Sequence, residues 1–195
     1  GTHGIKRAVQ RSGANIENDE TGIMGKWAQA GCGQNPAGRS ALAAGIGYAV
    51  PAITINKVCL SGATAVIEAT RRIRLGEIDV AVVGGQESMT NAPHLLPDSR
   101  QGHKYGPVTM IAAVAHDALR DTVTEVSLGD LTADGHGDRK IGRSEQDEIA
   151  AGSHQRAARA QRDNVFADEI APVEIPQRKG DPVVVSQDEG VRPDT

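Results

Sequence analysis

Three amphipathic stretches in the first half of the chain predict helices. Apolar residues recur there at the spacing of one helix face, and each stretch closes at or just before a glycine. The predicted helices cover residues 4–12, 36–45 and 63–76. In the third, the apolar positions fall at the 3.6-residue period of a helix: Ala63, Val66, Ile67, Thr70 and Ile73.

Short β-branched runs alternate with these helices at residues 23–27, 51–56 and 78–83, and each predicts a strand. The chain has only four aromatic residues, so a core must be aliphatic, as in parallel strands covered by helices. Strand, helix and strand in succession favour a right-handed parallel crossover. We therefore predict an α/β protein with a mixed, largely parallel sheet.

A stretch rich in proline and glycine begins near Asn91 and indicates a boundary, so we expect one domain at 1–92 and a second at 93–195. The pattern of the second domain predicts a helix at 108–119 and a polar loop at 129–142. A further helix should begin with Ser144 as its cap. Two short strands at 170–175 and 183–185 predict a hairpin-like excursion.

The charge pattern excludes several classes of protein. There are 21 basic and 25 acidic residues, a net charge of -4, and no basic face for nucleic acid is expected. No apolar run approaches the ~18 residues that cross a bilayer, so we expect no membrane partner and predict a cytoplasmic protein. The six histidines and two cysteines lack the spacing of metal ligands, and we predict no metal site.

Cys59 is the strongest candidate for chemistry because it falls between a predicted strand and a predicted helix. The amides at a helix N-terminus favour thiolate over thiol, and the thiolate is the nucleophile. The N–H of Cys59 could then donate to the oxygen of an acyl group. The alternative is a buried structural cysteine. By contrast, Cys32 favours a packing role, and Glu87 a structural rather than a catalytic one.

Three segments together resemble the thiolases, that is, acetyl-CoA acetyltransferases and 3-ketoacyl-CoA thiolases. Residues 56–62, NKVCLSG, resemble the nucleophile motif of that family, and residues 30–37, AGCGQNPA, resemble its AGxGQNPA loop. Residues 83–90, VGGQESMT, are similar to its GGxExMS segment. Shorter segments at 145–147, 153–155 and 177–181 are similar to its inserted loop domain, so the resemblance covers nearly the whole chain.

The resemblance implies a layered thiolase-like fold, incomplete at both ends, and a two-step exchange. Cys59 would take an acyl group from a coenzyme A thioester, and a second acyl-CoA enolate would attack the acyl-enzyme, or the reverse. Acetyl-CoA and acyl-CoA would be substrates, with no cofactor, in a homodimer or homotetramer. The tentative substrate contacts are Ser127 and Leu128, which stand where the family often has His-Met. Leucine keeps the apolar contact that methionine makes to pantetheine, and loss of the histidine affects substrate preference.

The family's catalytic histidine and second cysteine lie in motifs that are absent from these 195 residues, as is the strand expected before Gly1. We therefore predict that this polypeptide alone does not turn over acyl-CoA. Two alternatives stay open: a related condensing enzyme of the same superfamily, working on carrier-protein thioesters, and a noncatalytic module that retains a dimer-forming half of the fold. The AGxGQNPA and GGxExMS segments favour a thiolase.

Overall fold

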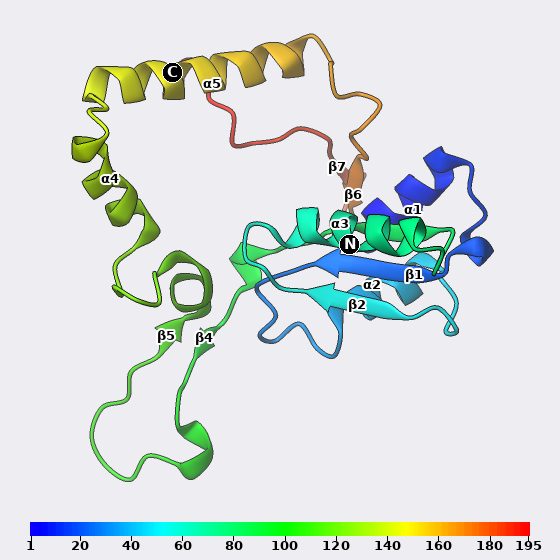
Figure 1. The fold of residues 1–195 in the computed structure, drawn as a ribbon, viewed down its shortest axis with the longest axis horizontal. Coiled ribbons are helices and arrows are strands. Elements are labelled where there is room, and N and C mark those ends of the chain that lie inside the picture. Colours follow the sequence, from blue (N-terminus) through cyan, green and yellow to red (C-terminus); the bar gives the residue numbers. More distant parts are fainter. The chain divides into compact units, whose positions relative to one another are not determined.

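A computed structural model describes all 195 residues of the chain. Contacts between residues divide it into two compact units, 1–128 and 129–195, both drawn in Figure 1. Residues 93–128 thus group with the α/β part of the chain. The assignment of residues 93–195 to one loop domain remains a prediction.

The first unit is built on a sheet of three parallel strands in the order β2-β1-β3. These strands are β1 (Thr21–Gly25), β2 (Ala52–Ile55) and β3 (Ala81–Gly85). Central β1 is buried throughout and ends where Gly25 pairs with both Ile55 and Gly85. As a result, β1 lies two residues before its predicted run, and β3 lies two to three residues after its predicted run. The α/β class is confirmed, and the three-stranded sheet is parallel throughout.

Helices cover both faces of this sheet, as Figure 1 shows. Helices α1 (Thr2–Ser12) and α2 (Pro36–Ala44) pack on one face, and α3 (Ser61–Arg74) packs on the other. Alternate strand residues point to opposite faces. The side chains toward α1 and α2 are Met24, Ala52 and Val82, and those toward α3 are Ile23, Ile55 and Val83.

The start of α2 follows the predicted cap. The side chain of Asn35 accepts a hydrogen bond from the Gly38 amide at 3.3 Å, and Pro36 is the first helical residue. Asn35 also donates from Nδ2 to the Ala52 carbonyl at 3.0 Å, and Thr54 Oγ1 donates to its Oδ1 at 2.9 Å. One side chain therefore caps α2 and fastens it to strand β2.

The helix predicted at 63–76 is confirmed by α3, but its larger apolar residues are not the ones that face the sheet. Small residues Ser61, Ala65 and Ala69 face the sheet, whereas Val66 and Ile67 are about half exposed. The physical reason is the close approach of α3 to the strands, because only small side chains leave room for backbone to lie near backbone. The larger side chains must therefore lie on the other face.

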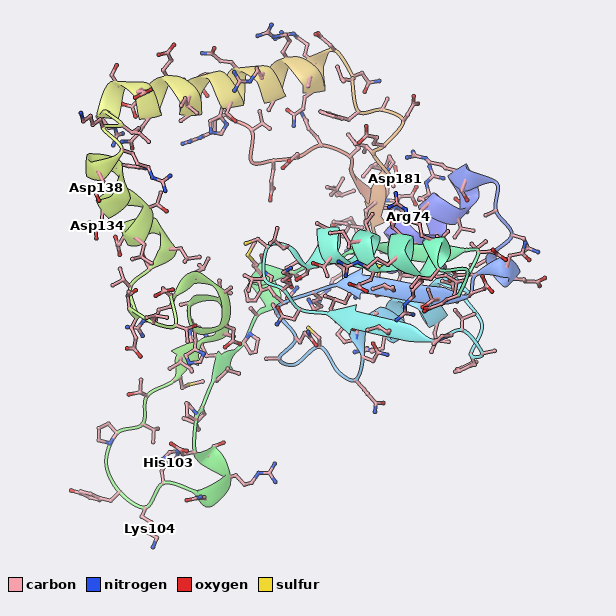
Figure 2. All side chains as sticks on the ribbon, viewed as in Figure 1. Arg74, His103, Lys104, Asp134, Asp138 and Asp181 are labelled. Carbon is pink, nitrogen blue, oxygen red and sulfur yellow. The ribbon has the colours of Figure 1, made fainter.

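Residues 93–128 contain a second, antiparallel sheet of β4 (His94–Leu95) and β5 (Ile111–Ala112). The predicted helix at 108–119 forms only in part: residues 113–114 are α-helical and η4 (Ala115–Leu119) is π-helical, whereas 111–112 form strand β5. Pairing between residues distant in sequence overrides local helix preference in this segment. Figure 2 labels His103 and Lys104 at the far end of the long loop that joins β4 to β5.

The second unit holds the helix α5 (Arg143–Arg162), most of α4 (Leu128–Asp138), and a hairpin of β6 (Val173–Ile175) and β7 (Val183–Val185). The hairpin confirms the prediction. The polar loop predicted at 129–142 is wrong, because glycine weakens a helix without forbidding it. Ser144 is not the cap, since α5 begins one residue earlier and Gly142 occupies the N-cap position.

Short 3-10 turns complete the description: η1 (Ile16–Asn18), η2 (Met89–Asn91) and η3 (Ser99–Gln101). None of the helices combines the length and the apolar character that a membrane crossing requires.

Candidate functional site

Cys59 lies on the turn that joins β2 to α3, and its side chain is exposed. The helix begins at Ser61 with Leu60 as its N-cap residue, and no side chain caps it. Cys59 is thus one residue ahead of the cap rather than inside the first turn. The strand-to-helix position predicted for this thiol is confirmed, and the buried alternative is wrong for the geometry observed.

The turn is closed by hydrogen bonds that do not involve the Cys59 amide. The Leu60 amide donates to the Lys57 carbonyl at 3.0 Å, and the Ser61 amide donates to the Val58 carbonyl at 3.2 Å. The Val58 amide donates to Oδ1 of Asn56 at 3.1 Å. The Cys59 amide is not used in closing the turn, and it lies next to the thiol at the positive end of α3.

Val58 holds an uncommon backbone conformation, with φ of 47°. For a β-branched residue this left-handed geometry is a real outlier, because Cβ approaches the neighbouring peptide groups. Such strain costs about 1–3 kcal/mol and persists only where the surroundings hold it in place. The residue immediately before the candidate nucleophile is therefore strained.

Ser61 makes two hydrogen bonds inside this turn. Its hydroxyl accepts from the Lys57 amide at 2.8 Å and donates to the Val58 carbonyl at 2.6 Å. The residue is only 5% exposed, so both bonds are shielded from water. The first residue of α3 thus binds the peptide groups on both sides of the turn.

Three glycines bring the start of α3 against the ends of two strands. A Cβ added to Gly25 would lie 2.5 Å from the backbone of both Ser61 and Gly62. A Cβ added to Gly62 would lie 4.0 Å from the Cα of Gly85, at the end of β3. No side chain larger than hydrogen fits at Gly25 without moving α3. This contact sets the height of the Cys59 turn above the sheet.

A second connection at the same edge of the sheet is the ion pair of Lys26 and Glu87. Lys26 Nζ lies 2.7 Å from Glu87 Oε1, and Lys26 is 7% exposed. The amides of Trp27 and Ala28 donate to Oε2 at 3.0 and 3.2 Å, and the Ser88 amide donates to Oε1 at 3.2 Å. Glu87 thus joins the loops that follow β1 and β3, in line with its predicted structural role.

The pKa of Glu87 is lowered as the net result of opposed causes. Burial raises the pKa of this carboxyl group, but hydrogen bonds from Lys26 and from the amides of Ala28, Trp27 and Ser88 outweigh it. The carboxylate is therefore ionised and fully engaged as an acceptor. A saturated carboxylate of this kind is suited to holding backbone in place rather than to taking up protons.

A cavity of about 370 Å³ lies beside this ion pair and is lined in part by Lys26, Cys32, Ser40 and Glu87. Cys59 is not among its lining residues. Cys32 is half-buried, and its thiol lies 3.3 Å from the Ala28 carbonyl. The packing role expected for Cys32 agrees with this placement.

The other predicted site residues lie on different elements. Ser127 forms an isolated antiparallel bridge with Arg120, and Leu128 is the first residue of α4. Both residues thus lie on elements other than the turn that carries Cys59. Their assignment to a coenzyme A site therefore stays a prediction.

Val58, Ser61 and Gly25 are the structural parts of the site that sequence reasoning missed. The left-handed Val58 has no sequence signal, because β-branched residues normally avoid that conformation. Gly25 did carry a signal, a glycine at the end of a buried strand, which often marks close backbone approach.

The fold and the site define an α/β protein with an exposed cysteine at a strand-to-helix turn. A family model described as "Thiolase, N-terminal domain" matches residues 1–195. The chain belongs to the thiolase family, and the fold expected from the resemblance is confirmed.

Named relatives cover the whole of this chain. A probable acetyl-CoA acetyltransferase of Mycobacterium tuberculosis is 52% identical over 195 residues, which are 100% of this chain and 50% of that protein. An acetyl-CoA acetyltransferase of Cupriavidus necator is 44% identical over 188 residues, 96% of this chain and 48% of that protein. The crystal structure of the Bacillus anthracis acetyl-CoA acetyltransferase matches with a TM-score of 0.93 at 33% identity, over 99% of this chain and 48% of that one. The chain spans about half the length of these relatives.

Proposed function

We propose that Cys59 is the acyl-accepting nucleophile of an acyl-CoA C-acyltransferase, an acetyl-CoA acetyltransferase or 3-ketoacyl-CoA thiolase. The observation that carries this proposal is the exposed thiol on the turn before α3, within a motif of the thiolase family. Relatives named acetyl-CoA acetyltransferase support a coenzyme A thioester as the acyl donor. They favour this activity over a condensing enzyme that works on carrier-protein thioesters.

In the first step, the Cys59 thiolate attacks the carbonyl carbon of acetyl-CoA. A bond forms between Sγ and that carbon, the bond from the carbon to the coenzyme A sulfur breaks, and coenzyme A leaves as its thiolate. Negative charge develops on the carbonyl oxygen meanwhile. The Cys59 amide, which takes no part in the turn's hydrogen bonds, is placed to donate to that oxygen.

In the second step, the enolate of another acyl-CoA attacks the acyl-enzyme and forms a carbon-carbon bond, or the reverse reaction cleaves a 3-ketoacyl-CoA. The family resemblance assigns the proton transfers to a histidine and a second cysteine outside these 195 residues. We therefore propose that the 195 residues alone accept an acyl group without completing turnover. Homodimer or homotetramer formation by the complete protein remains a prediction.

Acetyl transfer to Cys59 is the direct test. The 195-residue chain is incubated with acetyl-CoA, digested, and the acetylated peptide is identified by mass spectrometry. We expect one acetyl group on Cys59 and none on Cys32, which is the internal control. A Cys59→Ala variant should carry no acetyl thioester.

The rate of iodoacetamide alkylation at neutral pH gives a second readout that needs no substrate. We expect Cys59 to react faster than free cysteine, because its exposed thiol lies beside the backbone amides at the start of α3. A rate no faster than that of free cysteine, with no acetyl adduct, would reject Cys59 as a competent nucleophile.

A further inference from the structure

The residue before Cys59, Val58, has a backbone conformation that its own side chain disfavours, and neighbouring groups must stabilise it. Val58 is held at a positive φ, although its branched side chain opposes this conformation. A turn that stores strain relaxes unless its surroundings prevent it. Something next to Val58 must therefore hold the peptide groups on either side of it.

The hydroxyl of Ser61 meets that requirement. It is the acceptor for the Lys57 amide, which precedes Val58, and the donor to the carbonyl of Val58 itself. A hydroxyl offers one donor and two acceptor sites, so a single atom can make both bonds at once. Ser61 is 5% exposed, so little water reaches its hydroxyl to compete for these bonds.

The position of Ser61 is itself set by the sheet. The backbone of Ser61 and Gly62 lies against Gly25, and Gly62 adjoins the end of β3 at Gly85. The serine cannot move toward the sheet, because backbone atoms already occupy that space. Its hydroxyl is thus a fixed point to which the flexible turn is attached.

We propose that Ser61 is a positioning residue for Cys59: its hydroxyl holds Val58 in the left-handed conformation and thereby keeps the thiol at the N-terminus of α3. The inference deepens the proposed function and rests on it, since the reactivity of Cys59 is its readout. Ser61 itself does not contact the acyl group in this account. Its contribution is made entirely through the turn.

The competing contacts of the turn do not replace this hydroxyl. Asn56 accepts from the Val58 amide, which restrains one side of the residue. The Ser61 amide also donates to the Val58 carbonyl, at 3.2 Å. Neither bond reaches the Lys57 amide, for which the Ser61 hydroxyl is the partner shown.

The test uses four forms of the 195-residue chain: wild type, Ser61→Ala, Val58→Gly and the double variant. Alkylation of Cys59 by iodoacetamide is followed by peptide mass spectrometry, with Cys32 as the reference thiol in the same molecule. Loss of two shielded hydrogen bonds in Ser61→Ala should lower the Cys59 rate by about tenfold, with the Cys32 rate unchanged. Glycine adopts positive φ without strain, so the double variant should recover most of the wild-type rate.

This rescue separates positioning from a general structural role, because a serine needed only for folding would not be replaced by a glycine at 58. An unchanged Cys59 rate in Ser61→Ala overturns the proposal. So does a lowered rate that Val58→Gly fails to restore. If Ser61→Ala unfolds, the Cys32 rate rises with it, and the double variant must then refold; its failure to do so also overturns the proposal.

The proposed nucleophile, Cys59, and the proposed positioning residue, Ser61, are rejected by different results. A slow Cys59 in the wild type, no faster than free cysteine, counts against the proposed nucleophile. A fast wild type with no difference in Ser61→Ala leaves the nucleophile in place and removes only the role of Ser61.

Discussion

Helices α3 and α5 are both regular, but they are stabilised in different ways. Three small residues of α3 are buried against the sheet, whereas none of the 20 residues of α5 is buried. Every fully buried residue of the chain lies before residue 114, and the unit 129–195 contains none. Most helical stability in proteins comes from packing of an amphipathic face, and α5 has no buried residue on any face.

The contrast in burial between α3 and α5 indicates which part of this chain can hold a strained residue. A residue in an unfavourable conformation persists only when many contacts constrain it. The turn at Cys59 has such contacts: Gly25 lies against the start of α3, and Ser61 and Asn56 form hydrogen bonds with the turn. In the second unit the side chains of α4 repel instead: Asp134 and Asp138 lie one turn apart, both exposed (Figure 2).

The largest effect is expected from an alanine substitution in the first unit, at the contact between Gly25 and α3. Gly25→Ala puts a methyl group 2.5 Å from the backbone of α3, and we expect it to destabilise the first unit by about 3 kcal/mol. Urea unfolding followed by the fluorescence of Trp27, the single tryptophan, measures this. Gly85→Ala is the matched control, because its nearest neighbours would lie at 3.8 Å, an ordinary contact. Equal losses in the two variants would contradict the role given to Gly25.

The next largest effect concerns ion pairs. Lys26→Met leaves Glu87 without its cation, although three amides still bind the carboxylate, and we expect a loss of about 2 kcal/mol. Arg143→Met removes the pair with Asp147 on the exposed surface of α5, where we expect no measurable change. Urea unfolding should therefore separate the two variants clearly.

The Glu87 contribution also has a defined pH dependence. Because the folded-state pKa of Glu87 is lowered, the stability it supplies is complete above the ordinary glutamate pKa of about 4.3 and is lost as the pH falls through the folded value. Lys26→Met should weaken this dependence. Unfolding measured across that acid range checks the sign, and an unaltered slope would argue against the pair.

A smaller effect of opposite sign is expected at Asp19, which is buried at 5% exposure with no hydrogen-bond partner for either carboxylate oxygen. Burial raises its pKa, and the nearby amides of Val82, Thr21 and Glu20 offset this only in part. The unfolded chain ionises first, so stability falls as the pH rises above the ordinary aspartate pKa of about 3.9. Asp19→Asn should stabilise the chain by about 1 kcal/mol at neutral pH, with the gain vanishing in acid. A gain that persists in acid would point to another cause.

The smallest effect is the alanine substitution in the second unit. A Cβ at Gly135 of α4 would meet nothing within 4 Å, so Gly135→Ala should strengthen that helix by about 0.8 kcal/mol. Hydrogen exchange of the α4 amides, measured by mass spectrometry, should slow by a corresponding factor. Gly180→Ala is the contrasting control, because its φ of 87° disfavours any side chain. Faster exchange in Gly135→Ala would mean that α4 is packed more closely than its exposure indicates.

Sequence reasoning succeeded where one element is specified by its own residues. Asn35 and Pro36 predict the start of α2 because a cap and a first-turn proline act within a single turn. It failed in the first part of the predicted helix 108–119, where pairing of β5 with β4 across the 15 residues 96–110 decides the structure. The site followed the same division, since Cys59 was found from its local setting and Ser61 was recognised only from its bonds.

The order of strands and helices, the strand-to-helix position of Cys59 and membership of the thiolase family follow from the amino-acid sequence by itself, because periodicity, caps and motifs act between near neighbours. The tertiary structure alone decided which face of α3 is buried, why Gly25 has no side chain and how Lys26 meets Glu87, 61 residues away. Those features depend on how closely two backbone segments pack in the folded chain, and no local sequence pattern predicts that distance.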